Sequence, residues 1–524
     1  MAQHPHLPRV TYTNIGADFS GLHDFLDEAI PRARESLGRR IDNLIGGRPD
    51  ADGEPYAATS PIDDRVTLGH CLAASPAAAQ RAVAAARAAF PGWARRPWRE
   101  RVAILEEANR RLAERRFDLG LACLWEVGKS RFEAMGEAEE ALDLIPFYAA
   151  EMARNDGYVR TLATAVPGET GTTRLRPYGV FAVIGPYNFP IATPINMIVA
   201  ALITGNTVVY KPSRGAGLTA GLIADCLLGS GLPEGAFNLI CGDDATGRAL
   251  IAAGVDGAAI TGSMEAGHAI HAELARGPGV RPVIAEMGGK NATIVAASAD
   301  LDAAAEGLVR SAYGLQGQKC SACEVAYIDA SVWDALTPMI AARTRALGVG
   351  DPARREVFVG PLIDARAGAA YARAAEEARR DGTILAGGAR LSGGAHDHGV
   401  YVEPLLTCDL PPGHRHLKEE LFLPYLTLQK TGSLDEAIER ANATAYGLTA
   451  GFYGRDGAEL ERFLERMEAG TLYANRRSGA TTGAWPGVQS FGGWKGSGLT
   501  GKNAFGPHYL PLFMREQNRT LMAT

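Results

Sequence analysis

The feature that most constrains this fold is a regular alternation of short apolar runs with longer helical segments, which begins at Gly179. Residues 180–184 and 207–210 are rich in β-branched side chains, whereas 194–203 and 218–228 have the composition of helices. Strands that alternate with helices form a parallel sheet, because each crossover carries the chain back to the same end. The pattern predicts a doubly wound, Rossmann-type α/β domain with further strands at 237–240, 257–260 and 283–284.

A second α/β series starts at 291–295 and continues to about residue 475. Before the first series, a different pattern occurs: two β-rich runs at 158–162 and 171–176, joined by Pro167-Gly168. These runs predict a hairpin that stands apart from the main body. The chain has 524 residues, which is longer than a single hydrophobic core usually supports. We therefore expect two α/β domains besides the hairpin.

Charge and cysteine content argue against several functional classes. The formal net charge of -6 gives no electrostatic reason to expect nucleic acid binding. The apolar run at 195–203 is too short to span a membrane, and the first residues lack the basic and apolar regions of a signal peptide. Seven cysteines, an odd number in a long chain, fit a reducing compartment. We expect a cytoplasmic protein that binds neither nucleic acid nor membranes.

Cys320 lies in a segment that suits an accessible thiol, Gly314-Leu315-Gln316-Gly317-Gln318-Lys319-Cys320-Ser321-Ala322-Cys323. Small and polar neighbours leave room for a substrate to approach. A free thiol is mostly protonated near neutral pH, so a catalytic role requires further groups. Two alternatives remain open from the residues alone: a C-x-x-C redox pair of Cys320 and Cys323, which lacks a thioredoxin-type setting, and a purely structural cysteine.

Two further polar side chains lie where predicted strands end. Glu286 precedes Met287-Gly288-Gly289, where the glycines leave a carboxylate room to move. Asn188 follows another apolar strand in Gly185-Pro186-Tyr187-Asn188-Phe189-Pro190, and the prolines would hold its amide rigidly. Such an amide can donate to a developing alkoxide and typically contributes about 10²–10³ in rate. Taken singly, an exposed loop glutamate and a turn asparagine are the simpler interpretations.

Two strand–loop junctions could bind a nucleotide cofactor. Lys211 and Ser213 follow one strand, as contacts to a ribose or phosphate would. Thr261-Gly262-Ser263 leads from another strand into a helix, whose free N–H groups could bind pyrophosphate. There is no G-x-G-x-x-G motif. Gly128-Lys129-Ser130 is similar to part of a phosphate loop, but Cys123 stands where that loop needs a glycine, so the motif predicts only a helix break.

Together these motifs resemble the aldehyde dehydrogenase superfamily, in its order and approximate spacing, from about residue 40 to the end. The similar segments are Pro186-Tyr187-Asn188-Phe189-Pro190, Lys211-Pro212-Ser213, Thr261-Gly262-Ser263, Glu286-Met287-Gly288-Gly289-Lys290, Gly317-Gln318-Lys319-Cys320 and Lys418-Glu419-Glu420-Leu421-Phe422. The resemblance implies an NAD(P)-dependent dehydrogenase in which Cys320 attacks an aldehyde, Asn188 and the Cys320 N–H hold the oxyanion, and Glu286 activates water. It also implies cofactor contacts at Lys211, Ser213, Gly262, Ser263, Gly267, Glu420 and Phe422.

Within that family, the C-terminal part resembles the enzymes that oxidise L-glutamate γ-semialdehyde, which forms from 1-pyrroline-5-carboxylate. The similar segments are Ser321, the loop 478–498 and Gly506-Pro507-His508-Tyr509-Leu510. In that group a serine and the backbone of a Gly-Ala pair bind the α-carboxylate of the substrate; glycine lets N–H groups approach an anion closely. The resemblance implies a carboxylate anchor of Ser321, Gly483 and Ala484, with Phe189 and Phe491 along the aliphatic chain.

Two departures from the family pattern bear on coenzyme and substrate. Arg214 stands where many relatives carry an acid that holds the adenosine ribose, and an arginine can instead bind a 2′-phosphate. NAD is therefore the expected cofactor, with NADP as an alternative. Trp485-Pro486 lies inside the loop 478–498, and Leu423 and Tyr425 replace the Gly-Pro-Val that is common in the family after Phe422. The tryptophan could reshape the pocket for another aldehyde, such as succinate semialdehyde.

The resemblance also implies how the chain is divided. We expect a cofactor-binding domain of 1–157 and 178–286, a catalytic domain of 287–477, oligomerisation segments at 158–177 and 499–524, and a substrate-anchor loop at 478–498. Unpaired strand edges in the hairpin and tail favour a homodimer or larger homo-oligomer. A non-catalytic binding protein is a further alternative, although the intact Cys320, Glu286 and Asn188 argue against it. We expect no metal site, because His414 and His416 lie in a polar loop with no other clustered ligands.

Overall fold

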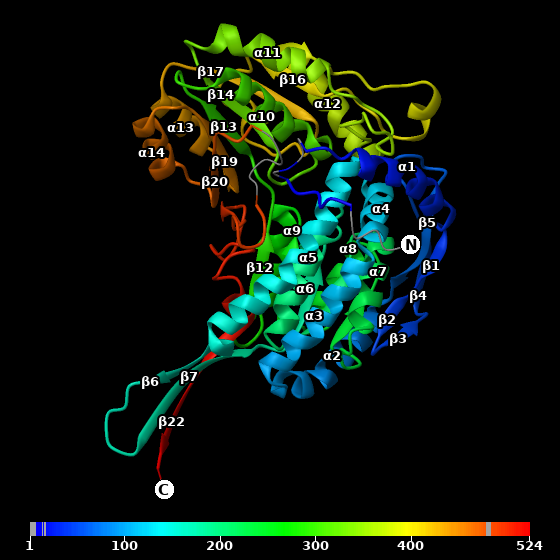
Figure 1. Cartoon of the computed structure of the whole chain (residues 1–524), viewed down its shortest axis with the longest axis vertical. Coiled ribbons are helices and arrows are strands. Elements are labelled where there is room, and N and C mark those ends of the chain that lie inside the picture. The colour runs from blue at the N-terminus through cyan, green and yellow to red at the C-terminus, as the bar shows by residue number, and fades with distance from the viewer. Residues whose placement is uncertain (1–6, 13, 15–16, 478–483, 524) are drawn as a thin grey trace.

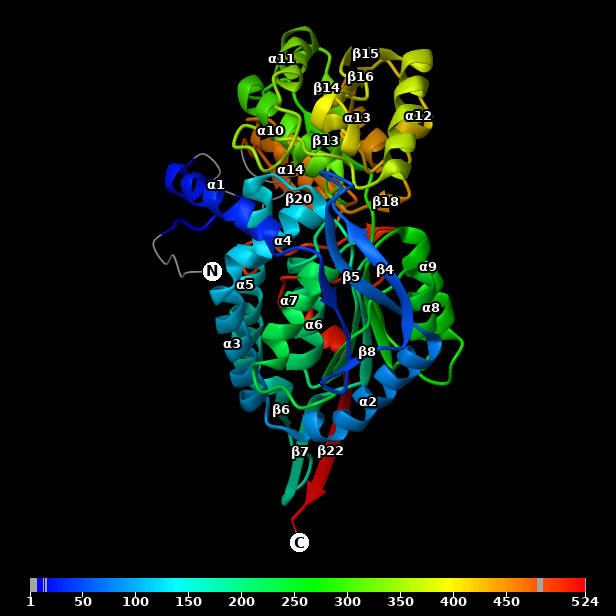
Figure 2. The same cartoon turned by 90° about the vertical axis from the view of Figure 1, so that its right-hand side faces the viewer.

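The computed structural model describes residues 7–12, 14, 17–477 and 484–523. Two large sheets lie one above the other along the longest axis, each covered by helices, and a narrow β-arm projects from the lower end (Figures 1 and 2). The α-helices are α1 (Ser20–Glu35), α2 (Pro76–Arg95), α3 (Trp98–Glu114), α4 (Arg116–Val127), α5 (Arg131–Arg154), α6 (Ala192–Ile203), α7 (Gly217–Leu228), α8 (Asp244–Ala252), α9 (Met264–Ala275), α10 (Leu301–Tyr313), α11 (Trp333–Arg345), α12 (Ala365–Asp381), α13 (Leu434–Asn442) and α14 (Gly457–Arg466).

The lower sheet has the strand order β12-β11-β8-β9-β10-β2-β3 and confirms the predicted doubly wound pattern. Its parallel part pairs β8 with β9 and β11, β9 with β10, and β11 with β12. From β8 the chain adds β9 and β10 toward one edge of the sheet, and it then returns to add β11 and β12 on the other side of β8. Ligands of open α/β sheets bind at the carboxyl ends of the strands beside such a reversal. The strands are β8 (Val180–Ile184), β9 (Thr207–Lys211), β10 (Phe237–Leu239), β11 (Gly257–Thr261), β12 (Val283–Glu286), β2 (Asn43–Ile45) and β3 (Arg48–Asp50).

The upper sheet has the order β15-β16-β17-β14-β13-β19-β20 and is parallel except for the edge strand β15. Its central strands are almost entirely buried, as both faces of a helix-covered parallel sheet must be. The strands are β13 (Asn291–Val295), β14 (Cys323–Asp329), β15 (Thr383–Ala386), β16 (Leu405–Cys408), β17 (Tyr425–Thr431), β19 (Thr449–Tyr453) and β20 (Thr471–Ala474).

The projecting β-arm combines two distant parts of the chain. β6 (Val159–Leu162) and β7 (Glu169–Pro177) form the predicted hairpin, and β22 (Met514–Met522) pairs antiparallel with the other edge of β7. Figures 1 and 2 show these strands extending away from both sheets, with the end of β22 near the tip. The arm exposes the apolar side chains of Val159, Leu162, Val166, Leu521 and Met522. A smaller three-stranded sheet contains β1 (Arg39–Ile41), β4 (Gly53–Thr59) and β5 (Thr67–Ala74). A two-stranded sheet contains β18 (Tyr446–Gly447) and β21 (Trp494–Lys495).

The predicted helix break at Gly128 is confirmed. Gly128 adopts a left-handed φ of +76° at the end of α4, and a side chain there would meet Pro361 at 2.9 Å. The Ser130 hydroxyl then caps α5 by accepting from the Glu133 N–H at 3.5 Å. Among the described residues, no helix combines the length and apolar character needed to cross a bilayer.

Candidate active site

The predicted site residues gather where the carboxyl edge of the lower sheet faces the amino edge of the upper sheet. Glu286 is the last residue of β12, and Asn188 follows the end of β8. From the other side, Cys320 lies three residues before β14, and Glu420 and Phe422 precede β17. Two parallel sheets that meet in this way bring loops from both into one site, although they are far apart in the sequence.

The backbone that leads to Cys320 is strained. Leu315, Gln316 and Gly317 have consecutive left-handed φ angles of +51°, +55° and +65°. A leucine and a glutamine rarely adopt this conformation, which costs of order 1–3 kcal/mol for each such residue. At Gly317 a side chain is excluded altogether, because its Cβ would lie 1.9 Å from the carbonyl oxygen of Leu423.

The helix break at Gly128 holds this strained segment in place. Glu133 on α5 accepts from the Leu315 N–H at 2.8 Å and from Lys319 Nζ at 2.6 Å. Gln316 Nε2 donates to the Gly128 carbonyl oxygen at 2.6 Å. The motif that was similar to a phosphate loop therefore supports the cysteine segment, a role that the sequence did not reveal.

On the far side of the thiol, Asn291 fixes the backbone. Its Nδ2 donates to the carbonyl oxygens of Cys320, at 2.6 Å, and Ala322, at 2.9 Å. Gly289 allows this close approach, since a Cβ there would lie 2.7 Å from the Cys320 oxygen. Cys320 itself is partly exposed, whereas Cys323 is the buried first residue of β14. The two cysteines thus differ in accessibility.

The surroundings of Cys320 favour the neutral thiol in the unliganded protein. Although part of the residue is exposed, desolvation of its sulfur within the site raises its pKa to about 12, and the nearby carboxylates of Glu420 and Glu286 act in the same direction. A nucleophilic thiolate at this position requires a base or a neighbouring positive charge when substrate and cofactor are bound.

Glu286 has the character of a free base. Its Oε2 is buried and accepts no hydrogen bond from the described residues. Burial raises the pKa of this carboxyl well above its usual range. A carboxylate with a raised pKa accepts a proton more readily, which is what activation of water requires. The backbone of Glu286 is fixed, because the Gly262 N–H donates to the main-chain carbonyl oxygen of Glu286 at 3.1 Å.

Asn188 links the lower sheet to the cysteine segment. The side chain is buried, and its Nδ2 donates to the Gln318 carbonyl oxygen at 2.9 Å, two residues before Cys320. An amide carries two N–H groups, so the second can donate to an oxygen of the substrate. Gln318 is also held from outside, since its Oε1 accepts from the Ile363 N–H at 3.0 Å.

The predicted cofactor contacts lie along the carboxyl edge of the lower sheet. Lys211 ends β9, and its buried Nζ donates to the carbonyl oxygens of Gly242 and Asp243 at 3.2 and 3.3 Å. Burial lowers the pKa of this amine. Ser263 caps α9 by accepting from the Ala266 N–H at 3.2 Å. Gly267 lets α9 approach β12, because a Cβ would lie 2.4 Å from Met287 Sδ.

Three further predicted cofactor contacts lie in the loops that follow β9 and β11. Ser213 is half-buried just after β9, and Gly262 lies between β11 and α9. Arg214 is exposed, and its guanidinium lies 4.7 Å from the centre of the Tyr56 ring and 3.8 Å from Asp243 Oδ2.

Glu420 and Phe422 are held by neighbours that sequence reasoning missed. Glu420 Oε1 accepts from the Gly289 N–H at 3.0 Å, and a Cβ at Gly288 would lie 2.0 Å from Glu420 Oε2. Burial and the nearby Glu324 raise the pKa of Glu420 to about 8. Phe422 has a φ of +58°, and its N–H donates to Glu324 Oε1 at 2.9 Å. Glu324 is paired with Lys290, the last residue of the Glu-Met-Gly-Gly-Lys motif. That lysine was the signal in the sequence that could have indicated a buried acid nearby.

The predicted substrate contacts are only partly within the described residues. Ser321 directly follows Cys320 and is half-buried, and Phe491 forms a backbone hydrogen bond with Ala504 at 2.9 Å. Phe189 packs over the buried amine of Lys129, with Nζ 3.7 Å from the ring centre, and Lys129 is paired with Glu137 at 2.6 Å. Ala484 is described, whereas Gly483 lies outside the described residues.

The expectation that His414 and His416 have no clustered ligands is wrong. Glu377, on α12, lies beside both imidazoles, with its Oε2 2.9 Å from His416 Nε2. The sequence could not show this contact, because α12 and the histidine loop are brought together only by the fold. The same oxygen also accepts from Arg415 Nε at 2.7 Å, so a cation already neutralises this carboxylate. The Glu377 carboxylate is therefore paired with Arg415, whereas burial lowers the pKa of His416 to about 4.

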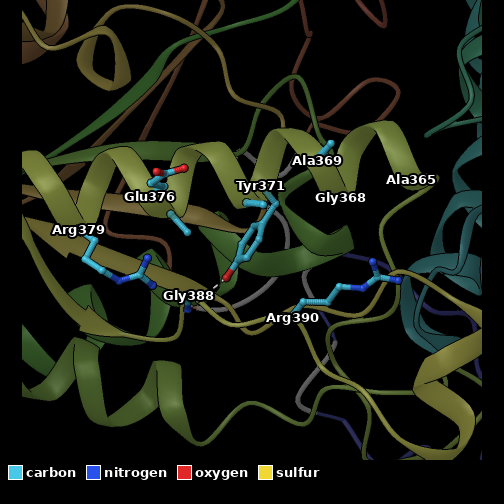
Figure 3. A pocket seen from close by; sticks show the side chains of 10 residues that line it. Ala365, Gly368, Ala369, Tyr371, Glu376, Arg379, Gly388 and Arg390 are labelled. Atoms are coloured by element: carbon cyan, nitrogen blue, oxygen red, sulfur yellow. Dashed lines mark hydrogen bonds between the residues drawn. The ribbon is translucent and has the colours of Figure 1, made fainter.

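A surface cavity of about 570 Å³ lies elsewhere, beside α12. Figure 3 shows Tyr371 pointing from α12 toward Gly388, whose N–H donates to the Tyr371 hydroxyl at 3.2 Å. Its lining includes Arg379 and Arg390 but none of the residues assigned to the site. The cavity therefore does not mark the chemistry around Cys320.

Comparison with known proteins agrees with this geometry. Residues 49–518 match the model of the aldehyde dehydrogenase family. The chain is 35% identical over 496 residues to a 1-pyrroline-5-carboxylate dehydrogenase of Geobacillus sp. (strain WCH70), covering 93% of this chain and 94% of the relative. It is 33% identical over 494 residues to that of Bacillus subtilis (strain 168), with the same coverage.

Solved structures give the same result. A point mutant of the 1-pyrroline-5-carboxylate dehydrogenase of Thermus thermophilus superposes with a TM-score of 0.92 at 32% identity, covering 100% of both chains. A Thermus 1-pyrroline-5-carboxylate dehydrogenase with bound NAD gives 0.91 at 32% identity, again over 100% of both chains. An NADP-dependent enzyme of E. coli gives 0.85 at 28% identity, covering 92% of this chain and 98% of the other. The family model spans most of the chain, and the relatives and solved structures match nearly its full length. In this fold, Cys320, Glu286 and Asn188 lie in one site. The chain belongs to the aldehyde dehydrogenase family.

Proposed function

We propose that this chain oxidises L-glutamate γ-semialdehyde, formed from 1-pyrroline-5-carboxylate, to L-glutamate with NAD(P) as hydride acceptor. The observation that carries the proposal is full-length similarity to 1-pyrroline-5-carboxylate dehydrogenases at 33–35% identity. Ser321, which directly follows Cys320, supports it because a hydroxyl at this position can donate to a substrate carboxylate. Gly483 and Ala484 would supply backbone N–H groups to the same anion.

Cys320 and Asn188 carry the first half of the proposed reaction. The Cys320 thiol loses its proton to solvent water, and its sulfur attacks the aldehyde carbon to form a thiohemiacetal, while the Asn188 amide and the Cys320 N–H donate to the oxyanion. The cofactor, when bound, supplies the acceptor for the hydride that leaves this carbon. The carbonyl then re-forms as a thioester on Cys320, while the fixed backbone around Cys320 keeps the reacting carbon in place.

Glu286 carries the second half. Its carboxylate takes a proton from water as the water oxygen attacks the thioester carbon. The carbon–sulfur bond then breaks, L-glutamate is released, and the sulfur is reprotonated. The free Oε2 and the raised pKa of Glu286 support this role, because an already paired carboxylate would be a weaker base. The oxidation thus needs both groups, in sequence.

The cofactor would lie along the carboxyl edge of the lower sheet. Lys211 and Ser213 would contact the ribose, and Gly262, Ser263 and Gly267 would allow the pyrophosphate to approach α9. Glu420 and Phe422 would face the nicotinamide end. Arg214 favours a 2′-phosphate by charge, but Asp243 lies 3.8 Å from its guanidinium and could bind a free ribose hydroxyl instead. We propose NAD as the usual cofactor, with NADP as the alternative.

A second candidate is oxidation of another aldehyde, such as succinate semialdehyde. Trp485-Pro486 favours it, because this pair directly follows Ala484 within the proposed substrate-anchor loop. The test measures NAD⁺ and NADP⁺ reduction with 1-pyrroline-5-carboxylate, succinate semialdehyde and pentanal. Preference for 1-pyrroline-5-carboxylate supports the leading proposal, preference for succinate semialdehyde supports the second, and turnover of pentanal alone contradicts both. The ratio of the rates with NADP⁺ and NAD⁺ tests whether Arg214 favours a cofactor with a 2′-phosphate.

We also propose the division of the chain into a cofactor-binding domain (1–157 and 178–286), a catalytic domain (287–477) and oligomerisation segments (158–177 and 499–524). Exposed apolar side chains on the β-arm support a homodimer or larger homo-oligomer, because an exposed edge with apolar residues invites pairing. Cysteine usage supports a cytoplasmic location. Light scattering at micromolar concentration tests the assembly, and a monomer would contradict it.

A further inference from the structure

Trp485 is anchored to α5 instead of standing free in the loop that follows the proposed carboxylate anchor. Its indole Nε1 donates to Asp143 Oδ2 at 2.8 Å. The ring also meets Tyr12 edge-on, with centroids 5.5 Å apart and an interplanar angle of 80°. Since Trp485 directly follows Ala484, these contacts limit how the Ala484 backbone can turn.

The loop itself is a tight turn that is attached at both ends. Trp485 and Gln489 exchange two backbone hydrogen bonds, each of 3.2 Å. Gln489 Nε2 then donates to the Leu472 carbonyl oxygen at 3.0 Å, which ties the turn to β20. Trp485 ties its other end to α5. The orientation of the segment next to Ala484 therefore depends on the Asp143 contact.

Residues 7–12, which we name the N-terminal strap, run along the same face of α5. Arg9 donates to Glu139 Oε2 at 2.7 Å and to Asp143 Oδ1 at 3.0 Å. Tyr12 OH donates to Glu140 Oε2 at 2.7 Å. Close contact is possible because Gly136 lacks a side chain; a Cβ there would lie 3.2 Å from the Tyr12 ring. The strap thus contacts three acids of one helix.

Asp143 joins the strap to the loop, because Arg9 binds one of its oxygens and Trp485 binds the other. Tyr12 makes a second connection: its ring touches Trp485, and its hydroxyl binds the buried carboxylate of Glu140. The strap is therefore connected to Trp485 at two points, through Asp143 and through the Tyr12 ring.

We propose that Tyr12 and Asp143 are positioning residues that, through Trp485, orient the Ala484 backbone toward an aldehyde that bears a carboxylate. The inference rests on the proposed function and deepens it, because it assigns substrate preference partly to the N-terminal strap. Backbone N–H groups bind an anion well only when they are held in direction before the ligand arrives. Release of Trp485 leaves the thiol chemistry intact but weakens binding of the carboxylate.

Four variants test this: Asp143→Ala, Asp143→Asn, Trp485→Phe and Tyr12→Phe. Asp143→Asn keeps an oxygen that can accept from the indole, Trp485→Phe keeps an aromatic ring but removes the N–H, and Tyr12→Phe removes only the hydroxyl. Trp333→Phe, on α11, is the matched control, because Trp333 lies in the upper part of the molecule against Lys430. KM and kcat are measured for 1-pyrroline-5-carboxylate and for pentanal, and thermal melting checks folding.

Asp143→Ala should raise KM for 1-pyrroline-5-carboxylate about tenfold, since small misplacement of a bound group can cost up to about 100-fold. Its kcat, and both constants for pentanal, should change little. Trp485→Phe should raise this KM as much as Asp143→Ala does. Asp143→Asn and Tyr12→Phe should raise it less, and Trp333→Phe should leave it unchanged.

Equal losses on both substrates would overturn the inference, because they indicate general damage. Unchanged KM values in Asp143→Ala or, should that variant not fold, in Trp485→Phe would overturn it as well. Failure of the proposed function looks different: the unmodified protein itself would show no preference for 1-pyrroline-5-carboxylate over pentanal.

Discussion

Cys320 and Glu286 lie in one site, but the protein holds them in contrasting ways. Around Cys320, three left-handed residues precede the thiol, Glu133 binds the segment at two points, and Asn291 holds the Cys320 carbonyl oxygen. Glu286 has a fixed backbone, but its carboxylate keeps a buried oxygen without a hydrogen bond from the described residues. A nucleophile that must meet a carbonyl carbon gains from a fixed position, whereas a base gains from an unpaired carboxylate with a raised pKa.

The largest effect is expected when the fixed group is removed. Cys320→Ala should lower kcat at least about 10⁴-fold, because no thioester can form without the nucleophile. Cys320 is partly exposed, so thermal melting should change little. Formation of reduced cofactor measures the loss. Turnover that survives in a folded Cys320→Ala protein would contradict the role of this thiol.

Removal of the free base should separate the two halves of the reaction. Glu286→Gln should lower steady-state kcat by about 10²–10⁴-fold while a single-turnover burst of reduced cofactor persists, since the base acts after hydride transfer. Rapid mixing measures the burst. If burst and steady state fall together, Glu286 acts earlier than we propose.

The same base predicts a pH dependence. Burial raises the pKa of Glu286 well above the usual range for a carboxyl, and only the ionised form accepts a proton. The deacylation rate should therefore rise as pH increases through this pKa and fall as the carboxyl is protonated below it. Glu286→Gln should lose this dependence in deacylation, while the burst, which depends on Cys320, keeps its own rise with pH. Parallel pH profiles in both proteins would argue against Glu286.

A smaller effect is expected when the support of the cysteine segment is loosened. Glu133→Ala removes the acceptor for the Leu315 N–H and the Lys319 amine, and misplacement of the thiol should lower kcat by about 10- to 100-fold. Burst rate and alkylation rate of Cys320 both measure this. Glu133→Gln, which keeps an acceptor, should lose less.

A matched control for this experiment is Glu114→Ala on α3, where an exposed glutamate pairs with Arg110 at the surface. That variant should keep full activity. Glu133→Ala with unchanged burst rate and alkylation would mean that the strained segment holds itself without α5.

The smallest effect is expected at Cys323. Cys323→Ser should leave kcat nearly unchanged and lower stability by about 1 kcal/mol, because the residue is buried at the start of β14 and takes no part in the proposed reaction. Activity assays and thermal melting check this. Strong loss of activity together with a disulfide in the unmodified protein would favour the alternative of a C-x-x-C redox pair.

Short motifs encode part of this fold and site, whereas contacts between distant residues add features that no motif indicates. The alternation of strands and helices predicted the doubly wound sheet, and Gly128 predicted the helix break, because both depend on local composition. The support that Glu133 gives to Leu315 could not be predicted, since nearly two hundred residues separate them and only the packing of α5 brings them together. For the same reason the sequence could not place Glu377 beside His416.

The site shows the same division. Asn188, Glu286 and Cys320 each stand in a recognisable motif, so their types and order indicated the family. Glu324 accepts from the Phe422 N–H and pairs with Lys290. It follows Cys323 in the sequence, where no motif indicates this role. Tyr12 lies in a segment with no recognisable motif, and its contact with Trp485 joins opposite ends of the chain. Residues that react leave local patterns, whereas residues that hold them in position depend on the complete fold.

The β-arm has a consequence for how this protein is made. β7 is the central strand of the arm, but its partner β22 begins only at Met514, after both large sheets are encoded. During translation, one edge of β7 therefore stays open while most of the chain emerges from the ribosome, and open edges invite wrong pairing. The arm is complete only when residues 514–522 have been made, so any contact that uses the whole arm must form after both large sheets have been synthesised.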